Sequence, residues 1–172
     1  MAVSVLIVRV AEAEPLVARL RERYDPAAQR GLGAHITLLH PFADPERLDA
    51  ALLREIASLA SARAAFSYQL VHLARFPGTL YLAPEPAAPF VALRAALQAA
   101  FPPFGPPTGR SSTYVPHLSI VRGSDGEDHE VEEGLRAILK AHGPIECRCR
   151  ELVLIENTSG TWRTVREFAL AA

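Results

Sequence analysis

The apolar residues of this chain follow two spacings, continuous runs that are typical of buried strands and stripes with helical spacing. Residues 2–10 (AVSVLIVRV) are a compact segment rich in β-branched side chains and predict a buried strand. Leu48, Leu52, Ile56 and Leu59 recur at every third or fourth position, which predicts a helix with one buried stripe. The pattern therefore divides the chain into short strands and amphipathic helices.

Extending these two patterns along the chain gives the expected order of elements. Strands are predicted over residues 2–10, 35–40, 65–75, 79–83, 145–156 and 161–170, and within 114–121. Helices are predicted over residues 12–24, 45–60 and 130–142, and from the proline-rich segment 84–89 to about Ala100. Segment 101–107 (FPPFGPP) is the strongest break, since paired prolines fit neither helix nor ladder, and is a candidate seam between two halves. The order β-α-β-α-β-β-α, break, β-α-β-β predicts an α+β fold with a mostly antiparallel sheet.

One local pattern occurs twice, each time on a predicted strand. Residues 35–38 read His-Ile-Thr-Leu and residues 117–120 read His-Leu-Ser-Ile. Because side chains alternate along a strand, the histidine and the hydroxyl of each motif share one face, and the apolar residues enter the core behind them. Each motif thus predicts an imidazole and a hydroxyl side by side on a rigid strand.

Two such units facing one cleft suit phosphodiester chemistry. Histidine has an unperturbed pKa of about 6.5, so near pH 7 one of His35 and His117 can act as a neutral base while the other acts as a protonated acid. The hydroxyls of Thr37 and Ser119 can donate hydrogen bonds to non-bridging oxygens as their charge grows. These donors supply the stabilisation that a cation otherwise would, so we expect no metal and no other cofactor.

Composition and charge narrow the class of protein further. The chain has 172 residues, 49% hydrophobic and 22% charged, as expected of one globular domain. A formal net charge of −1 gives no global positive field, so any phosphate binding must be local. The N-terminus has no basic signal-peptide region, no apolar run reaches about 18 residues, and the close pair Cys147 and Cys149 suits a reducing compartment. We therefore expect a soluble, cytoplasmic protein with no membrane segment. Since no leucine-rich exposed stripe demands a dimer, we expect a monomer.

At the two motifs the sequence resembles the 2H phosphoesterase superfamily, which is named for its two His-x-Ser/Thr motifs. Within it the resemblance is to the 2′-5′ RNA ligase-like, RNA 2′,3′-cyclic phosphodiesterase branch, over essentially the whole chain. Three segments carry it: HITLLHPF at 35–42, RFPGTLYLAP at 75–84 and YVPHLSIVR at 114–122. One departure is Ser119, where threonine is commoner, and serine keeps the hydroxyl donor. The resemblance implies a single bilobal domain over residues 1–172. Its two pseudo-symmetric lobes would each contribute one motif, with helices outside and the active cleft between them.

The resemblance also implies an activity, the metal-independent hydrolysis of a 2′,3′-cyclic phosphate on an RNA end or nucleotide to a 2′-phosphate. In that scheme we expect His117 to activate water and His35 to protonate the leaving 3′-oxygen, while Thr37 and Ser119 hold the phosphoryl oxygens. Because the motif is symmetric, the opposite assignment of base and acid stays open. Joining RNA ends through a 2′-5′ bond would use the same groups by microscopic reversibility.

Four further residues are candidates for substrate binding. Arg122 follows the second motif and could clamp phosphate, although on a regular strand its side chain would point away from the motif histidine. Tyr114 could contact phosphate or base, and Phe76 and Phe42 could offer a stacking face to a base. For each residue the alternative is structural, an exposed strand end for the arginine and packing for the aromatic rings.

Three other functions fit parts of the pattern. A non-catalytic RNA- or nucleotide-binding module would keep the cleft but has no need of paired proton-transfer groups. A 2H enzyme for a small nucleotide, such as ADP-ribose cyclic phosphate or a 2′-5′ oligoadenylate, fits the near-neutral charge. A metallohydrolase that uses several of the six histidines lacks an Asp/Glu cluster at ligand spacing, and His40 has the opposite strand parity to His35. Activity that survives EDTA would exclude the metallohydrolase.

Overall fold

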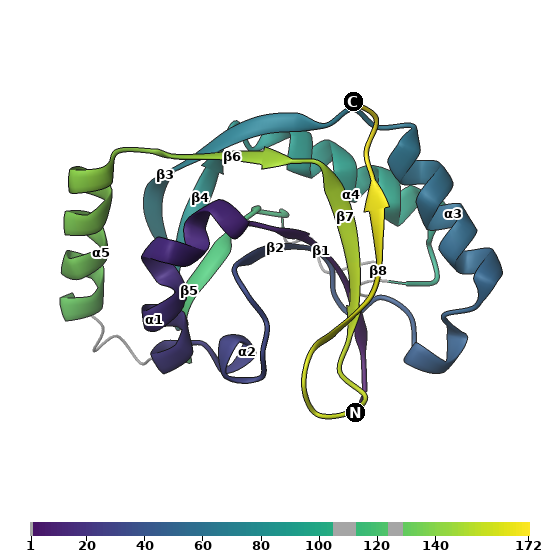
Figure 1. The fold of residues 1–172 in the computed structure, drawn as a ribbon, viewed down its shortest axis with the longest axis horizontal. Helices are drawn as coiled ribbons and strands as arrows, with labels where there is room; N and C mark the ends of the chain where they lie inside the picture. The colour runs from purple at the N-terminus through teal and green to yellow at the C-terminus, as the bar shows by residue number, and fades with distance from the viewer. Residues whose placement is uncertain (1, 105–112, 124–128) are drawn as a thin grey trace.

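A computed structural model describes residues 2–104, 113–123 and 129–172 (Figure 1). Its strands are β1 (Ser4–Arg9), β2 (His35–Leu39), β3 (Phe66–Phe76), β4 (Thr79–Glu85), β5 (Leu118–Arg122), β6 (Ile145–Cys149), β7 (Glu151–Glu156) and β8 (Arg163–Ala169). Its α-helices are α1 (Glu14–Tyr24), α2 (Pro26–Gln29), α3 (Ala50–Ser61), α4 (Ala88–Ala100) and α5 (His129–His142).

The strands form two four-stranded sheets, in the orders β2-β1-β7-β8 and β5-β4-β3-β6. Neighbouring strands in both sheets are antiparallel. Helices lie on the outer sides of the sheets: α3 packs against β8, α4 against β2 and α1 against β5 (Figure 1). The predicted α+β fold, with antiparallel sheets in two lobes and helices outside, is confirmed.

The chain builds the first sheet from its two ends and the second sheet from its middle. The N-terminal strands β1 and β2 join the C-terminal β7 and β8, whereas β3 to β6 make the second sheet. The break at 101–107 is therefore wrong as a seam between the sheets, because β4 and β5, which flank it, pair directly. Residues 105–107 of that break lie outside the described residues.

The predicted strand over 145–156 is two strands that belong to different sheets. β6 pairs with β3, and after Arg150 the chain enters β7, which pairs with β1. Burial alternates along β6, whereas five consecutive residues of β7 are buried. The change from alternating to continuous burial marks the point where the chain crosses from one lobe to the other.

One apolar core joins the two sheets, and a smaller cluster lies on the opposite face of the first sheet. The core includes the fully buried Ile36 of β2 and Leu118 of β5, so it makes the two sheets one folding unit. The smaller cluster, against which Leu32 and Trp162 pack, consists of Val5, Ile7, Val153 and Ile155. It lies on the same side of the first sheet as the functional residues described next.

Candidate active site

The first motif lies on β2 in the predicted way. β2 pairs with β1 along its whole length, and this pairing fixes which face each side chain occupies. Ile36 is fully buried in the core, whereas His35 and Thr37 are half-buried on the other face. The strand alternation predicted from the sequence holds at these three positions.

The second motif lies at the start of β5. Ser119 pairs with Tyr81 of β4 and is half-buried, while Leu118 beside it is fully buried. His117 stands immediately before the strand and is also half-buried. Each lobe thus holds one imidazole and one hydroxyl against a buried apolar layer.

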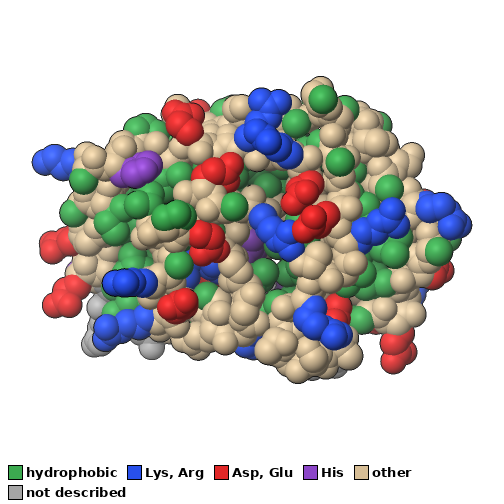
Figure 2. Space-filling view, in the orientation of Figure 1, with side chains coloured by type: hydrophobic (Ala, Val, Ile, Leu, Met, Phe, Trp, Pro, Cys, Tyr) green, Lys and Arg blue, Asp and Glu red, His purple; other side chains and the backbone are tan. Residues whose placement is uncertain are grey.

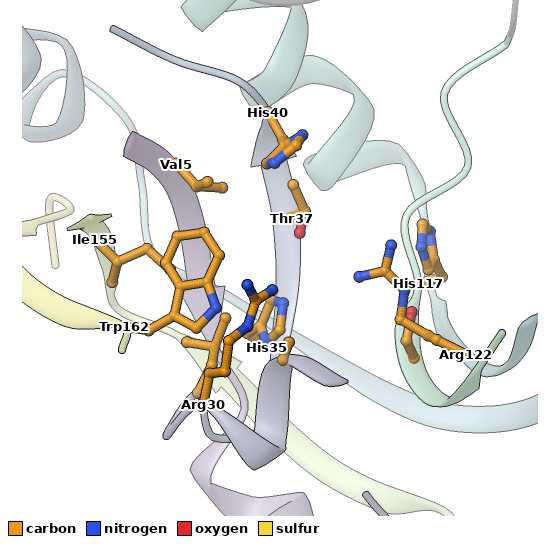
Figure 3. Close-up of a pocket in the computed structure, with 12 residues that line it drawn as sticks. Val5, Arg30, His35, Thr37, His40, His117, Arg122, Ile155 and Trp162 are labelled. Carbon is orange, nitrogen blue, oxygen red and sulfur yellow. The ribbon is translucent and has the colours of Figure 1, made fainter. Parts of the chain in front are cut away.

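The four motif side chains line one cleft between the two sheets, with a volume of about 420 Å³. In Figure 3, His35 and Thr37 lie on one wall, and His117 and Arg122 lie across from them. This volume is in the range of sites for small molecules. The fold therefore brings together two motifs that are far apart in the sequence.

Both motif strands carry a β-bulge at the same point, directly after the hydroxyl residue. The pairing register skips Leu38 in β2 and Ile120 in β5. A bulge inserts one extra residue and thereby reverses the facing of the residues that follow it. As a result His40 and Arg122 also line the cleft. For Arg122, which required a departure from the regular strand, the bulge meets that condition. The parity argument that placed His40 on the opposite face from His35 was wrong, because it assumed a regular strand.

The hydrogen bonds of the two catalytic candidates fix the same tautomer in both lobes. The Nδ1 of His35 lies 2.8 Å from the carbonyl oxygen of Gly33, and the Nδ1 of His117 lies 2.8 Å from that of Val115. A carbonyl oxygen can only accept, so Nδ1 carries the proton in each ring. The neutral rings then have an unprotonated Nε2, which is the atom that can accept a proton from a bound reactant.

Burial lowers the pKa of both histidines. Desolvation is the main cause in each ring, and the Arg122 guanidinium adds to it. For His35, the Arg21 guanidinium also lowers the pKa, the Gly33 hydrogen bond and the Asp25 carboxylate oppose the shift, and the pKa falls to about 4. Both rings are therefore neutral at pH 7 in the unliganded cleft. Desolvation and Arg122 lower the pKa of His40 as well, so one guanidinium acts on all three cleft histidines.

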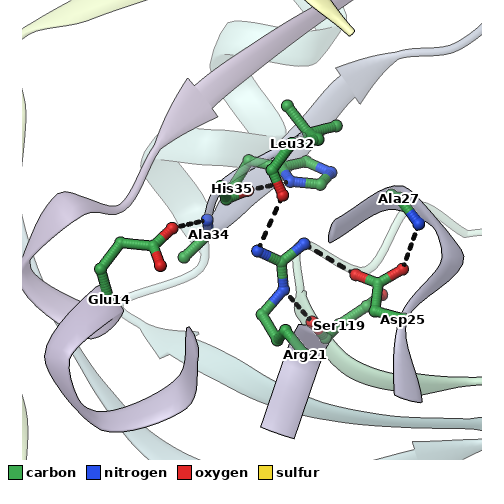
Figure 4. Close-up of polar contacts among 9 residues, drawn as sticks. Glu14, Arg21, Asp25, Ala27, Leu32, Ala34, His35 and Ser119 are labelled. Carbon is green, nitrogen blue, oxygen red and sulfur yellow. Dashed lines mark hydrogen bonds and ion pairs between the residues drawn. The ribbon is translucent and has the colours of Figure 1, made fainter. Parts of the chain in front are cut away.

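Arg21 of α1 holds the backbone of both motif regions from behind (Figure 4). Its side chain is only 2% exposed. Nε donates to the Ser119 carbonyl oxygen and Nη1 to the Leu32 carbonyl oxygen, both at 3.1 Å, while Nη2 donates to Asp25 at 2.7 Å. Asp25 also accepts a hydrogen bond from the Ala27 N–H at 2.9 Å, which caps α2. One buried guanidinium thus connects α1, the loop before β2, and β5.

Tyr114 makes a second connection between the lobes and does not line the cleft. Its hydroxyl donates to the Thr37 carbonyl oxygen at 2.8 Å, and the Arg94 guanidinium lies over its ring, 4.5 Å from the centroid. Arg94 in turn donates to the Leu38 carbonyl oxygen at 2.7 Å. The structure therefore corrects the predicted contact of Tyr114 with phosphate or base, because this side chain is directed at the backbone of β2.

The two phenylalanines predicted as stacking faces lie outside the cleft lining. Phe76 stacks on Tyr81 with ring centroids 4.3 Å apart and meets the His117 ring edge-on at 5.1 Å. Phe42 is 4% exposed and packs in the core against Phe101. For Phe42 the predicted stacking role is wrong, because the ring is buried in the core. Phe76 is half-buried and does not line the cleft, and its stacking role stays a prediction.

Sequence reasoning missed part of the cleft wall. Besides the motif residues, His40 and Arg122, the cleft is lined by Val5, Ala27, Arg30, Leu32, Ile155 and Trp162. These residues come from β1, from the segment between α1 and β2, and from β7 and the turn that follows it. No local motif marks them, and the only signal was that Trp162 is the single tryptophan of the chain.

Three observations concern the surface charge, the metal ligands and the helices of the described residues. Positive and negative side chains are intermixed on the face shown in Figure 2, which presents no continuous basic track. Within residues 2–104, 113–123 and 129–172, no three side chains from His, Cys, Asp and Glu are grouped as metal ligands. Over the same ranges, no helix has the length and apolar character needed to span a membrane.

Comparison with protein families identifies one match. The model of the 2′-5′ RNA ligase superfamily matches residues 9–161, an interval that contains both motifs. A comparison with curated protein sequences finds no match.

Several solved structures share the fold over almost the whole chain. LigT from E. coli in complex with 3′-AMP has a TM-score of 0.65 at 13% identity, and 99% of this chain aligns with 98% of that one. TT0787 from Thermus thermophilus has a TM-score of 0.64 at 17% identity, with the same coverage. ATU0111 from Agrobacterium tumefaciens str. C58, a conserved protein of unknown function, has a TM-score of 0.55 at 15% identity, covering 99% and 85%. At these identities the similarity establishes the fold.

Proposed function

The chain belongs to the 2′-5′ RNA ligase superfamily, and from that premise we propose that it hydrolyses 2′,3′-cyclic phosphates without a metal ion. The observation that carries the proposal is the pairing of His35 and His117. Each ring uses Nδ1 for a backbone hydrogen bond, leaves Nε2 for proton transfer, and lines the same cleft beside a hydroxyl. A protein of similar fold, E. coli LigT, has been crystallised with 3′-AMP, a nucleotide whose phosphate is on the 3′-oxygen of the ribose.

In the proposed reaction, His117 Nε2 takes a proton from water while the water oxygen attacks phosphorus. The bond between phosphorus and the ribose 3′-oxygen breaks, and the protonated Nε2 of His35 gives its proton to that oxygen. The product is a 2′-phosphate with a free 3′-hydroxyl. His117 then holds the proton that His35 lost, in net terms, and exchange with solvent restores both rings. The opposite assignment gives the same balance, because the two motifs are pseudo-symmetric.

The remaining cleft groups stabilise the charge that develops on the phosphoryl oxygens. The hydroxyls of Thr37 on β2 and Ser119 on β5 both line the cleft and can each donate to a non-bridging oxygen. The Arg122 guanidinium supplies positive charge near all three cleft histidines. With an RNA 5′-hydroxyl in place of water, the same groups would form a 2′-5′ phosphodiester bond.

A small nucleotide, such as ADP-ribose cyclic phosphate or a 2′-5′ oligoadenylate, is the second candidate substrate. The cleft volume of about 420 Å³ and the intermixed surface charges favour a nucleotide or a single RNA end over a long duplex. A binding module without turnover is the remaining alternative, and it gives no use to two free Nε2 atoms in one cleft. Cytoplasmic location and a monomeric state stay predictions.

The first experiment is ring opening in excess EDTA. The substrates are an oligoribonucleotide with a terminal 2′,3′-cyclic phosphate, adenosine 2′,3′-cyclic phosphate and ADP-ribose cyclic phosphate. We expect at least one ring to open and a 2′-phosphate to form, as resolved by chromatography against 2′- and 3′-phosphate standards. Loss of activity in EDTA would contradict metal independence. If none of the three rings opened, the proposed hydrolysis would be rejected for these substrates, and the non-catalytic binding module would remain as the alternative.

We expect kcat/KM to follow a bell-shaped pH profile whose two limbs both lie below pH 6.5. One histidine must be protonated, and since its pKa is lowered, activity falls as pH rises through that lowered value. The other must be neutral, so activity is also lost at low pH, and the lower of the two pKa values, about 4 for His35, sets that limb whichever ring is the base. The shape does not depend on which ring is the base, because the two titrations are read as a pair.

The profile is measured as initial rates at low substrate from pH 3.5 to 9, with circular dichroism at each point. That control is needed because histidines whose pKa is lowered by folding reduce the stability of the fold as pH falls below about 6.5. An optimum above pH 7 in a fully folded protein would contradict the prediction.

A further inference from the structure

An apolar surface forms the wall of the cleft next to the first motif. We call it the tryptophan wall and define it as Val5, Leu32, Ile155 and Trp162, all of which line the cleft together with His35. Val5 and Ile155 are 3% and 2% exposed, and the half-buried Leu32 and Trp162 pack against them. In Figure 3 the Trp162 ring lies between Val5 and Ile155 on one side and Arg30 on the other.

The chemistry of phosphoryl transfer has no use for this wall. A phosphate needs hydrogen-bond donors and positive charge, which the motif hydroxyls and Arg122 supply on the other parts of the cleft. A flat aromatic base, in contrast, gains free energy by stacking on an indole ring, and does so with little dependence on base identity. The cleft therefore has a polar part that fits a phosphate and an apolar part that fits a base.

Two contacts of Trp162 go beyond what simple coverage of the sheet would require. The Arg30 guanidinium lies over the indole ring, 5.8 Å from its centroid, so the ring already engages a flat cationic group. The backbone N–H of Trp162 donates to the Arg30 carbonyl oxygen at 2.9 Å, which holds the two residues together. Arg30 itself is exposed, so its guanidinium can move aside or stack on a ligand.

The indole Nε1 of Trp162 is buried and has no acceptor among the described residues. Buried polar groups are nearly always satisfied, so an N–H without a partner in a ligand-sized cleft needs an explanation. An aliphatic residue would cover Val5 and Ile155 without leaving a donor unpaired. Because this donor lies in the plane of the ring, a ligand oxygen beside the ring, and not the base stacked on its face, would accept from it.

We propose that the tryptophan wall and Arg30 form the subsite for the base of the nucleotide whose cyclic phosphate His35 and His117 open. The inference rests on the proposed function for its placement of the phosphate, but it makes a separate claim about binding. It predicts that the protein acts on nucleosidic phosphates in preference to cyclic phosphates that lack a base. It also predicts weak discrimination among bases, since stacking accepts any of them.

The first test uses the fluorescence of Trp162, which is the only tryptophan of the chain. Wild-type protein is titrated with adenosine 2′-monophosphate and, separately, with inorganic phosphate and ribose 5-phosphate. We expect a saturable change of intensity with the nucleotide and little change with either base-free ligand. An equal response to all three, or no response to the nucleotide at its binding concentration, would overturn the proposal. This readout needs no turnover, so it holds even if the proposed activity fails.

The second test compares substrates and variants. Adenosine 2′,3′-cyclic phosphate is paired with glycerol 1,2-cyclic phosphate, which has the same five-membered ring and no base. Trp162→Leu keeps an apolar cover over the wall but removes the ring, and we expect it to lower kcat/KM about 5- to 100-fold for the nucleotide, mainly through KM, with no comparable loss for the glycerol substrate. Trp162→Phe, which keeps a ring, should recover part of the loss.

The outcomes separate the two claims. If wild-type protein opens both rings with similar kcat/KM, or if Trp162→Leu reduces both equally, the phosphoesterase activity stands and the base subsite is wrong. If wild-type protein opens neither ring, the proposed function fails for these substrates and the fluorescence titration still decides whether the wall binds a base. Thermal unfolding of each variant checks that a loss of activity does not come from loss of the fold. If Trp162→Leu fails to fold, the comparison is made between Trp162→Phe and wild-type protein only.

Discussion

Replacing His35 or His117 by alanine should lower kcat for ring opening by about 10³- to 10⁴-fold while leaving the melting temperature within a few degrees of wild type. Each ring provides one proton transfer, and a positioned acid or base contributes about 10²- to 10⁴-fold. The effect should lie at the upper end, because no other described group carries a free Nε2 paired with a hydroxyl on the same wall. Single-turnover assays with adenosine 2′,3′-cyclic phosphate measure it.

The double variant and a hydroxyl variant give the controls. Because the two rings act as a unit, removal of both should cost little more than removal of one. Thr37→Ala removes a donor but no proton-transfer group, so its loss should be smaller, about tenfold to a thousandfold. If either histidine variant kept activity within tenfold of wild type, or if the two losses multiplied, the acid–base pair would be the wrong description of this cleft.

The sequence predicted the motif faces because strand alternation is a local rule. His35 and Thr37 share a face, and so do His117 and Ser119, as two-residue periodicity requires. The rule failed one step later, because the bulges after each motif depend on pairing with neighbouring strands. Local sequence does not show that register. The one sequence signal is a pair of consecutive apolar residues at each bulge, Leu38-Leu39 and Ile120-Val121, where strict alternation would place a polar residue.

The bulges also explain a symmetry that the motif alone did not reveal. Position five after each motif histidine holds His40 in one lobe and Arg122 in the other, and both side chains face the cleft. The two lobes therefore share the same β-bulge but carry different side chains after it. Chemical symmetry ends at that position, where one lobe has a fixed positive charge and the other a group whose pKa is lowered by burial and by that charge.

Contacts between segments far apart in the chain were beyond sequence reasoning. Tyr114 and Arg21 each bind a backbone carbonyl of a motif residue, 77 and 98 positions away in the chain. Carbonyl groups are present at every residue, so no residue type or spacing marks such a bond in advance. The tryptophan wall is similar, since Trp162 reaches the cleft only because β7 and β8 return the C-terminal part of the chain to β1.

The strand wrongly joined over 145–156 has the same origin. Both of its parts are strands, and only their partners differ, β3 for the first and β1 for the second. The strand conformation was therefore predicted correctly, and its division into two strands was missed. The crossing at Arg150 is what allows the two termini to complete one sheet around a middle segment that forms the other.

Replacing Arg21 by methionine should have the largest effect on stability, a loss of about 3–5 kcal/mol, because it leaves the buried Asp25 carboxylate without its cation. The side chains of this pair are 2% and 0% exposed, so water cannot take over the lost contacts. For a chain of this length the melting temperature should fall by about 6–20 °C. Arg136→Met is the matched control: its guanidinium pairs with Glu132 in an ion pair where the arginine is 61% exposed, and its loss should cost less than about 1 kcal/mol.

Arg21 should also act as a positioning residue for catalysis. Its bonds to the carbonyl oxygens of Ser119 and Leu32 hold the second motif strand and the loop before the first, and a displacement of about 1 Å can cost about 100-fold in rate. We therefore expect folded Arg21→Met, assayed well below its melting temperature, to lose kcat more than KM. Arg21→Met combined with Asp25→Asn removes the uncompensated charge and keeps an acceptor for the α2 cap, so it should regain stability without regaining kcat. Recovery of both together would show that Arg21 serves the fold alone, whereas stability without activity requires that its two carbonyl bonds set the distance between the motifs.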